Sequence, residues 1–598
     1  MNECVPLQLD RLKEKFLFRA FFLRLPCLAF LPSDYFHPLL PRSLFHRPQS
    51  RSTARSRRRA LRCYRLAALT SGHLQTKGNG MEERNANVIS SAIGDFGRWQ
   101  AAISVLVSLL KLPIAWFQLS IVFLAPLQDF WCEAPSPDVS LGDWRNETLN
   151  NCNANCSRYE FDTSVFKRTI TSEWALVCEK SQLSNVVQMS FMFGALVGNV
   201  IFGIASDRFG RKTPLMTAIA IQAFSSFALS FVPWFWAFLL LRFILAISTG
   251  GTMITSFVLC VETIGGKWRT SIPILYQIPF GLANSIMAVM AYFLRDWRQL
   301  TLAMSTISML FLSYWWLIPE SPRWLLAVGE EEKAAKILEK AAKKNRLNPK
   351  EIATILSSRA SPILNGTKPQ ERGPPPFLGL FKTRNLRRNT LSLFFNWFVA
   401  GLCAFGFSQF ISFIGRNEDI FVNFTVGGLV TIPGTLLCIY VVKRFGRRKT
   451  IILSGIVYGI TCMLVGAVPA GRFPHEWPKI VFAGIALVSM SITFPALYLY
   501  SGELLPTVAR NGGLGASSMF ARFGSMIAPF ILSLNIYGEY VPLLIMGILP
   551  VLAVLLLIPM PDTKGCSLPD TLEEGENFGR KERGANGDAR SYMQITQQ

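Results

Sequence analysis

The stretch Gly203-Ile204-Ala205-Ser206-Asp207-Arg208-Phe209-Gly210-Arg211-Lys212 forms a short, basic turn between two long apolar segments. A weaker copy, Lys443-Arg444-Phe445-Gly446-Arg447-Arg448, stands between two apolar segments about half a chain later. A motif and a hydropathy pattern that recur together at this distance are typical of transporters built from two repeats. Glycine permits the tight turn, and the cationic side chains can pair with carboxylates at neighbouring helix ends.

The segments beside these turns belong to a series of apolar blocks, each close to the roughly 20 residues that a helix needs to cross a bilayer. Half of the 598 residues are hydrophobic and 17% are charged, a balance that favours a membrane protein over a soluble domain. We therefore predict an all-α membrane protein with twelve transmembrane helices in two six-helix halves. The predicted spans lie near residues 103–125, 184–205, 214–232, 235–258, 271–294, 300–318, 388–412, 418–442, 450–469, 479–499, 511–534 and 541–559.

The formal net charge of +23 reflects membrane topology rather than binding to nucleic acid. Residues 1–80 hold 15 Lys and Arg against 4 Asp and Glu, and many other cations stand in short loops between spans. An excess of Lys and Arg in short loops marks the cytoplasmic side of a membrane. We therefore expect both termini in the cytoplasm. No recognition helix or aromatic–basic platform indicates a nucleic-acid partner.

The chain outside the spans divides into segments of distinct composition. Residues 1–80 are rich in arginine, and we interpret them as an alternative start or a disordered extension rather than the organelle-targeting peptide that they superficially resemble. A later segment has the spacing of short amphipathic helices beneath the membrane, with apolar Ala334, Ala335, Ile337, Leu338 and Ala341. The predicted domains are the extension 1–80, the first half 81–318, the cytoplasmic loop 319–387, the second half 388–560 and the tail 561–598.

One long loop, 126–183, falls on the predicted outer face of the membrane. It contains four cysteines and two N-glycosylation sequons, which suits the oxidising side of a membrane. Four cysteines allow two disulfides in three possible pairings, and the sequence leaves the pairing open. The alternative is that the thiols are free and the sequons fortuitous. The residues concerned are Cys132, Cys152, Cys156 and Cys178, with Asn146 and Asn155 as the glycan acceptors.

The basic turns have candidate partners at the ends of spans four and ten. Glu262 and Arg269 follow span four, and Glu503 and Arg510 follow span ten. Pairs that break and re-form together would bias an inward-closed state against an inward-open one. The alternative is that these charges only anchor helix ends at the membrane surface. The gating candidates are Asp207, Arg208, Arg211, Glu262, Arg269, Glu320, Arg323, Arg444, Arg447, Glu503 and Arg510.

Together these motifs resemble the major facilitator superfamily and, within it, the organic cation/anion/carnitine transporter family. The resemblance is carried by Asp207-Arg208-x-Gly210-Arg211, by Pro319–Leu325 after span six, by Tyr276-Gln277 in span five and by Glu503–Asn511 after span ten. It covers most of the chain and implies the major facilitator fold and a secondary carrier of small organic ions. The second basic turn departs from the family pattern, because Lys443 stands where the first turn has an aspartate.

Two positions in this resemblance bear on the charge of the substrate. The cation-selective branch has an acidic residue in span eleven and a glutamate before the Ile-Pro of span eight, where this chain has Arg522 and Thr431. An arginine at midplane depth is costly unless it meets an anion in a wet cavity, and its planar fork suits a carboxylate. A purely structural role, pairing with backbone carbonyls, is the alternative. Lys111 in span one is a second embedded cation, and snorkelling or packing near Pro113 is its alternative role.

Other residues complete the predicted site. By resemblance, four residues of spans five, seven and ten line the central cavity: Gln277, Trp397, Phe494 and Tyr498. The last two are four residues apart and share a helix face, where their rings would hold the apolar body or a quaternary ammonium of the substrate. Taken singly, each aromatic more often faces lipid or packs against a helix. Ser518 and Ser525 lie within about one helical turn of Arg522 and would add hydrogen bonds.

The predicted function is transport of a small organic anion or carnitine-like zwitterion through a plasma membrane by alternating access. An organic cation carrier is one alternative, and a non-transporting receptor or scaffold with a carrier fold is another. The sequence contains no phosphate-binding loop, no catalytic constellation and no metal site, so we expect neither an enzyme nor a bound cofactor. Sodium or proton symport, exchange for an organic anion and uniport all remain open, and so does the oligomeric state.

Overall fold

The structure is a computed structural model. It describes residues 92–126, 128–133, 149–152, 156, 158–265, 268–348, 376–411, 420–469, 476–506, 509–564, 569 and 571–578, without the side chains of 269, 270, 376–378 and 511. The extension 1–80, the sequons at Asn146 and Asn155, and the side chain of Arg269 therefore lie outside the described residues.

In the first half, helices occupy all six predicted spans, and three of these spans are interrupted. Span five breaks at Tyr276 and Gln277, just before a proline at the start of the next helix. The elements are α3 (Arg98–Leu109), α4 (Lys111–Leu119), α5 (Ile121–Leu124), α8 (Gln182–Phe209), α9 (Lys212–Leu229), α10 (Phe235–Thr263), α11 (Trp268–Leu275), α12 (Ile278–Phe293), α13 (Trp297–Leu310), η3 (Phe311–Ser313) and α14 (Tyr314–Leu317).

In the second half, a helix occupies each of the other six predicted spans. Four of these helices run through an internal proline, which membrane helices tolerate when neighbouring groups satisfy the freed carbonyl. The elements are α18 (Arg384–Phe410), α19 (Ile420–Phe445), α20 (Arg447–Ala467), α21 (Trp477–Leu504), α22 (Arg510–Leu532), η9 (Ser533–Tyr537) and α23 (Tyr540–Leu557).

The described part of the chain contains 11 helices that are long and apolar enough to cross a membrane. The remaining predicted span, near 214–232, corresponds to α9, which is 18 residues long but carries the polar residues Lys212, Gln222, Ser225 and Ser226. The all-α membrane class is therefore confirmed, and a helix stands at each predicted span.

Close helix contacts hold α22 against α18 within the second half. A Cβ on Gly524 would lie 2.0 Å from the carbonyl oxygen of Phe398, and one on Gly401 would lie 2.0 Å from that of Ala521. Small residues let membrane helices approach closely, where van der Waals contact replaces the hydrophobic effect. This contact fixes the position of the central turns of α22, which carry Arg522. Between the halves, α8 packs on α22 and α12 on α19.

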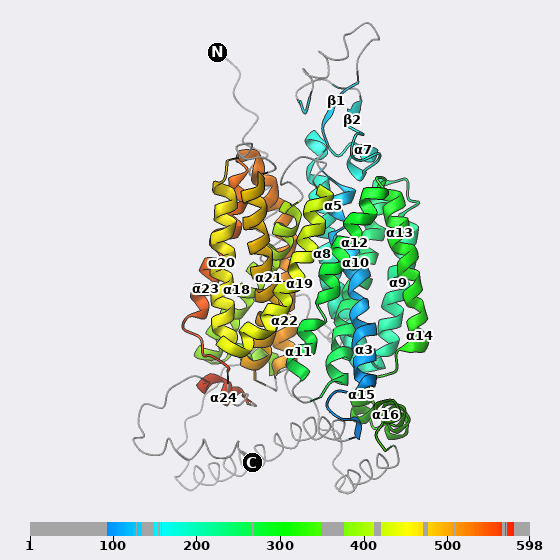
Figure 1. The fold of residues 1–598 in the computed structure, drawn as a ribbon, viewed down its shortest axis with the longest axis vertical. Helices are drawn as coiled ribbons and strands as arrows, with labels where there is room; N and C mark the ends of the chain where they lie inside the picture. The colour runs from blue at the N-terminus through cyan, green and yellow to red at the C-terminus, as the bar shows by residue number, and fades with distance from the viewer. Residues whose placement is uncertain are drawn as a thin grey trace, which may run out of the picture. The chain divides into compact units, whose positions relative to one another are not determined.

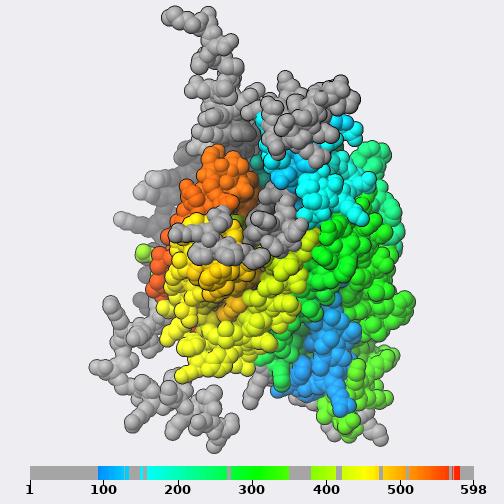
Figure 2. All heavy atoms as spheres, turned by 45° about the horizontal axis from the view of Figure 1, so that its top comes forward, coloured from blue at the N-terminus to red at the C-terminus, as the bar shows by residue number. Residues whose placement is uncertain are grey.

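The loop after span one forms a small disulfide-linked unit. β1 (Phe130–Cys132) pairs antiparallel with β2 (Tyr159–Phe161), and α7 (Ile170–Trp174) and η2 (Cys178–Lys180) follow. Of the three pairings that the sequence allows, the structure has Cys132 with Cys156 and Cys152 with Cys178. Figure 1 shows this unit at one end of the helices, and Figure 2 shows its cyan residues against the green helices of the first half. We call this end the loop end.

Short helices lie at the other end, which we call the basic end because it holds both basic turns (Figure 1). They are α15 (Pro322–Val328), α16 (Glu331–Asn345), η4 (Pro376–Phe381) and α24 (Leu572–Asn577). The predicted amphipathic helix is present as α16, and Ala334, Leu338 and Ala341 are buried on it. Its last residue, Asn345, accepts a hydrogen bond from the backbone N–H of Trp99 at 2.8 Å, so α16 is tied to the start of α3.

Candidate functional site

The first basic turn holds Arg211 between two carboxylates. Arg211 Nη2 lies 2.7 Å from Glu262 Oε1, and Nη1 lies 2.8 Å from Asp207 Oδ1. The side chains of Arg211 and Glu262 are 11% and 18% exposed, whereas that of Asp207 is 81% exposed, so the pair with Glu262 is the stronger one. Burial disfavours the cation, but the ion pairs with Glu262 and Asp207 outweigh this and raise the pKa of Arg211 above its ordinary value.

The backbone of the same turn binds a third carboxylate. Glu320 Oε1 accepts hydrogen bonds from the backbone N–H groups of Arg211 at 2.7 Å and Lys212 at 3.2 Å. These donors start α9, where unpaired N–H groups and the helix dipole favour a negative charge. Gly210 has φ +93° and ψ 174°, a conformation almost restricted to glycine, and a Cβ there would lie 2.4 Å from Glu320 Oε2. Glycine is therefore favoured at position 210 both by the backbone conformation and by the lack of space for a Cβ beside Glu320.

The second basic turn has a similar arrangement, in which an aspartate replaces the glutamate beside the glycine. Arg447 Nη2 lies 2.8 Å from Glu503 Oε1, as Arg211 pairs with Glu262. Gly446 has φ +90°, and a Cβ on it would lie 3.0 Å from Asp562 Oδ2. Asp562 thus takes the place that Glu320 has in the first half, and Thr563 Oγ1 donates to Glu503 Oε2 at 2.6 Å.

Sequence reasoning missed Asp562 and Thr563 because both fall in the segment assigned to the tail. A signal was present, since Pro561-Asp562-Thr563 has the same pattern as Pro319-Glu320-Ser321 at the end of the first half.

The other gating candidates are less engaged in these networks. Arg208 and Arg444 have exposed side chains, and Arg323 Nη2 donates to the carbonyl of Ile264 at 3.0 Å. Arg510 Nε donates to the carbonyl of Leu505 at 3.3 Å. The Arg211 and Arg447 ion pairs each join two residues of the same half.

Arg522 lies near the middle of α22 and is only 5% exposed. Its Nη2 is 2.9 Å from Met253 Sδ on α10, and its Cζ is 5.9 Å from the ring centroid of Phe405 on α18. Nη1 is buried and has no hydrogen-bond partner among the described residues. A buried guanidinium with an unused donor is costly unless an anion satisfies it. Arg522 therefore keeps one donor that no described residue satisfies.

Lys111 is the second embedded cation and is 3% exposed. Its Nζ lies 4.7 Å from the ring centroid of Tyr276, whose hydroxyl is 2.7 Å from Ser256 Oγ. In the described part of the chain, neither Lys111 nor Arg522 forms an ion pair with a carboxylate. This region therefore carries an excess of positive charge.

The predicted aromatic residues form one cluster. Trp397 lies 5.5 Å from Phe494 and 4.5 Å from Tyr498 between ring centroids, and its indole N–H donates to Ser501 Oγ at 2.9 Å. Phe257 of α10 adds a ring 5.6 Å from Tyr498, so the cluster joins the two halves. Sequence reasoning assigned neither Phe257 nor Met253, which lies one helical turn before it on α10.

Two other predicted site residues, Thr431 and Ser525, have local roles in helix packing. Thr431 Oγ1 donates to the carbonyl of Gly428 at 2.7 Å, at the contact between α12 and α19. Ser525 Oγ donates to the carbonyl of Gly401 at 3.1 Å, at the contact between α18 and α22. Gln277 is the N-cap of α12 but makes no side-chain cap bond. Ser518 is half-buried on α22.

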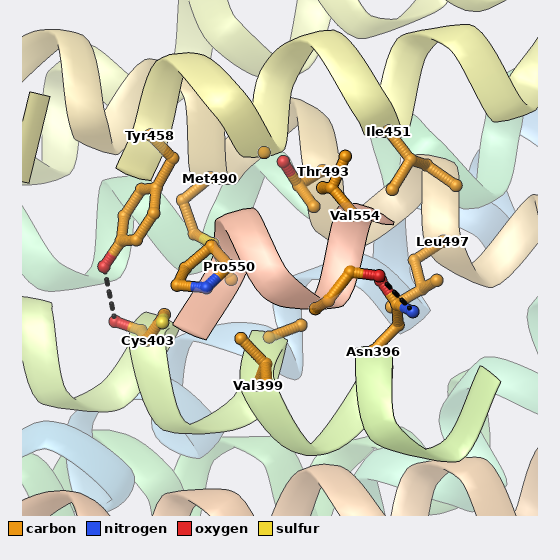
Figure 3. Close-up of a pocket in the computed structure, with 13 residues that line it drawn as sticks. Asn396, Val399, Cys403, Ile451, Tyr458, Met490, Thr493, Leu497, Pro550 and Val554 are labelled. Atoms are coloured by element: carbon orange, nitrogen blue, oxygen red, sulfur yellow. Dashed lines mark hydrogen bonds between the residues drawn. The ribbon is translucent and has the colours of Figure 1, made fainter. Parts of the chain in front are cut away.

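A small, mostly apolar pocket lies inside the second half, between α18, α20, α21 and α23 (Figure 3). Asn396 Nδ2 donates across it to the carbonyl of Ala553 at 3.0 Å, and the Tyr458 hydroxyl donates to that of Cys403 at 3.4 Å. None of the predicted substrate-binding residues lines this pocket. It is therefore separate from the site around Arg522.

Comparison with known proteins decides the family. The family model for sugar (and other) transporters matches residues 139–573. The organic cation transporter protein of Drosophila melanogaster is 33% identical over 520 residues, which cover 82% of this chain and 94% of that protein. Solute carrier family 22 member 3 of Mus musculus is 31% identical and covers 81% and 94% of the two chains. This chain belongs to the organic cation/anion/carnitine transporter family of the major facilitator superfamily.

Further matches agree with this family. Human organic cation/carnitine transporter 2 is 29% identical over 82% of this chain and 94% of its own length. Among solved structures, the proton:xylose symporter XylE has a TM-score of 0.55 at 18% identity, covering 80% and 98% of the two chains. An identity this low supports the fold alone, and the major facilitator fold is confirmed. The chain is a multi-pass membrane transporter and not an enzyme, and this family's fold needs no cofactor.

Proposed function

We propose that this chain carries small organic anions, or zwitterions that contain a carboxylate, across the plasma membrane by alternating access. The observation that carries the proposal is the buried Arg522, whose Nη1 has no hydrogen-bond partner among the described residues. A substrate carboxylate would satisfy this donor and neutralise the charge. A hydrogen bond to a charged group contributes about 1.5–3 kcal/mol, so one such contact is enough to select anions over neutral solutes.

The surroundings of Arg522 support an anion rather than a simple cation. No described carboxylate pairs with Arg522 or with the embedded Lys111. A substrate with only positive charge would be repelled by the guanidinium of Arg522. The rings of Trp397, Phe494 and Tyr498 would hold the apolar body of the substrate or a quaternary ammonium group. Carnitine, named in one relative, has both a carboxylate and a quaternary ammonium.

The direction of the chain in the membrane follows from its charges. We place the basic end in the cytoplasm with both termini, and the disulfide-linked loop end outside, because short basic turns stay on the cytoplasmic side. The sequons at Asn146 and Asn155 would then belong to the side of the membrane on which N-glycans are added. In this orientation the ion pairs of Arg211 and Arg447 lie at the cytoplasmic ends of the two halves, where each would hold the helix ends of its own half together as the halves rock.

An organic cation carrier is the second candidate, and the names of two Drosophila melanogaster relatives favour it, since one is an organic cation transporter protein and the other an organic cation transporter-like protein. It predicts that tetraethylammonium accumulates and that Arg522 is dispensable. The anion carrier and the cation carrier can therefore be distinguished in a single uptake assay.

The test is uptake of labelled carnitine, benzoate and tetraethylammonium into cells expressing the full chain. We expect uptake of at least one carboxylate, and we expect Arg522→Ala to abolish it at equal surface abundance. Arg168→Ala, which removes an exposed arginine at the loop end, is the matched control and should leave uptake unchanged. Accumulation of tetraethylammonium alone, unaffected by Arg522→Ala, would establish the cation carrier instead. Repeating the assay with a sodium gradient, a proton gradient or cells preloaded with an organic anion distinguishes the modes of coupling.

A further inference from the structure

One contact joins the two halves directly at the guanidinium of Arg522. Met253 lies on α10 of the first half, and its Sδ is 2.9 Å from Arg522 Nη2 on α22 of the second half. We propose that Met253 sets the affinity of the site for anions, because its thioether holds Arg522 weakly in the empty carrier and the incoming carboxylate displaces it. This inference rests on the proposed role of Arg522 as the anion-binding residue.

The chemistry of the thioether suits a contact that must be given up. The sulfur of methionine is a weak hydrogen-bond acceptor, and its side chain is flexible enough to move aside. An amide oxygen in the same place would hold the guanidinium much more firmly, and a carboxylate would neutralise it. The substrate would then have to break a strong internal bond before it could bind. A weak acceptor orients Arg522 and leaves most of its binding capacity for the substrate.

The face of α10 that carries Met253 points toward the second half rather than into the core of the first. One helical turn later, Phe257 lies 5.6 Å from the ring of Tyr498 on α21 and 5.8 Å from that of Tyr276. Met253 itself is only half-buried. The neighbouring hydroxyls of Thr252 and Thr255, in contrast, bond back to carbonyls of their own helix. Met253 and Phe257 therefore belong to the first-half wall of the site around Arg522.

The position of this contact also couples affinity to the movement of the halves. Alternating access requires the two halves to separate around the site in turn. A contact between Met253 and Arg522 must break whenever α10 and α22 move apart. A weak contact allows this separation, whereas a strong internal ion pair would hold the empty carrier in one state. The thioether thus sets both how easily an anion binds and how easily the empty site opens.

The test is a series at position 253 in which the side chains have similar size but increasing acceptor strength. Transport of the labelled carboxylate is measured for Met253→Leu, wild type, Met253→Gln and Met253→Glu, with KM and Vmax corrected for surface abundance. We expect KM to rise in that order, by about tenfold for Gln and about a hundredfold for Glu, since each new bond to the guanidinium must be broken. Met253→Leu should lower KM about twofold because it leaves Nη2 unpaired.

The matched control is Met309→Gln, the same substitution on a half-buried methionine of α13, which should not change KM. If Met253 had only a packing role, the variants would lower surface abundance or Vmax. The KM values would then not follow the acceptor strength of the side chain at position 253. Met253→Leu removes the acceptor while keeping an apolar side chain, so it tests the idea even where Gln or Glu prevents folding. A rise in KM for Met253→Leu would show that the sulfur assists binding and would overturn the inference.

Failure of this inference can be separated from failure of the proposed function. If Arg522→Ala abolishes carboxylate uptake but Met253→Gln keeps KM within about twofold of wild type, Arg522 binds the anion and Met253 does not set its affinity. If Arg522→Ala transports the carboxylate with wild-type KM, the proposed anion site is wrong. The proposed role of Met253 is then wrong as well, because it depends on that site.

Discussion

The two basic turns show which parts of the repeated motif the protein uses in both halves. Each turn has a glycine with positive φ, Gly210 and Gly446, and each pairs an arginine with a buried glutamate. They differ in the residue four positions before the arginine, which is Asp207 in the first half and Lys443 in the second. Because Asp207 is 81% exposed, solvent weakens its ion pair with Arg211. The absence of an aspartate at position 443 therefore costs the second half little stability.

A second difference concerns the carboxylate that follows each half. Glu320 accepts hydrogen bonds from three backbone N–H groups, those of Arg211, Lys212 and Ser321. Asp562 lies against Gly446 at a similar place, while the neighbouring Thr563 binds Glu503. The comparison indicates that the arginine–glutamate pair and the glycine turn form the common core of the two basic turns. The substitutions below are arranged from the largest expected effect to the smallest.

The largest effect is expected from removing the arginine of either turn. Arg211→Ala leaves Glu262 without its cation, and Arg447→Ala does the same to Glu503; each should cost about 2–4 kcal/mol because these carboxylates are mostly buried. The apparent melting temperature of the purified protein, with surface abundance, measures this loss. Similar losses are expected for both variants, and a loss confined to Arg211→Ala would mean that the arginine–glutamate pair does not stabilise the second turn as it does the first.

An intermediate effect is expected from the glycines, and it should differ between the halves. Gly210→Ala and Gly446→Ala each force a side chain into a backbone conformation that costs about 1–3 kcal/mol. Gly210→Ala should be the more harmful, because its Cβ would lie 2.4 Å from Glu320 Oε2, against 3.0 Å from Asp562 Oδ2 for Gly446→Ala. Gly484→Ala on α21, where no atom lies within 4 Å of the new Cβ, is the control. Thermal melting of the three variants tests this order.

The smallest effect is expected at the position where the turns differ. Asp207→Asn should lower stability by less than about 1 kcal/mol, because the exposed pair with Arg211 is screened by water and salt. Lys443→Asp, which restores the first-half pattern, should change the melting temperature equally little. A large loss of transport for Asp207→Asn with unchanged melting would show that this aspartate acts in a state of the carrier with different contacts.

Much of the architecture could be predicted from the sequence because the hydropathy signal is local. Helices were found at the twelve predicted spans, although α3 and α4 divide the first span and α9 is less apolar than the others. The amphipathic segment was predicted from spacing and is α16. Its docking on α3 through Asn345 could not be foreseen, because a hydrogen bond between residues so far apart in the chain leaves no periodic pattern.

The site was only partly accessible to sequence reasoning. Arg522 was singled out by its charge in an apolar segment, and the aromatic cluster was assigned by resemblance to the family. Met253 and Phe257 were missed because methionine and phenylalanine are ordinary residues of a membrane helix. Thr431 and Ser525 were assigned to the substrate, and in the structure their hydroxyls bond to helix carbonyls. A residue type by itself does not tell which side of a helix faces the site.

The sequence alone determined the membrane class, the repeat, the basic turns and the family, since each of these depends on composition and spacing along the chain. The tertiary structure decided which distant residues meet. It joined Cys152 to Cys178, Asp562 to the second turn, and Met253 to Arg522 across the two halves. The physical reason is that burial of a helix can be read from its own residues, whereas a contact between two helices depends on how both pack and rotate.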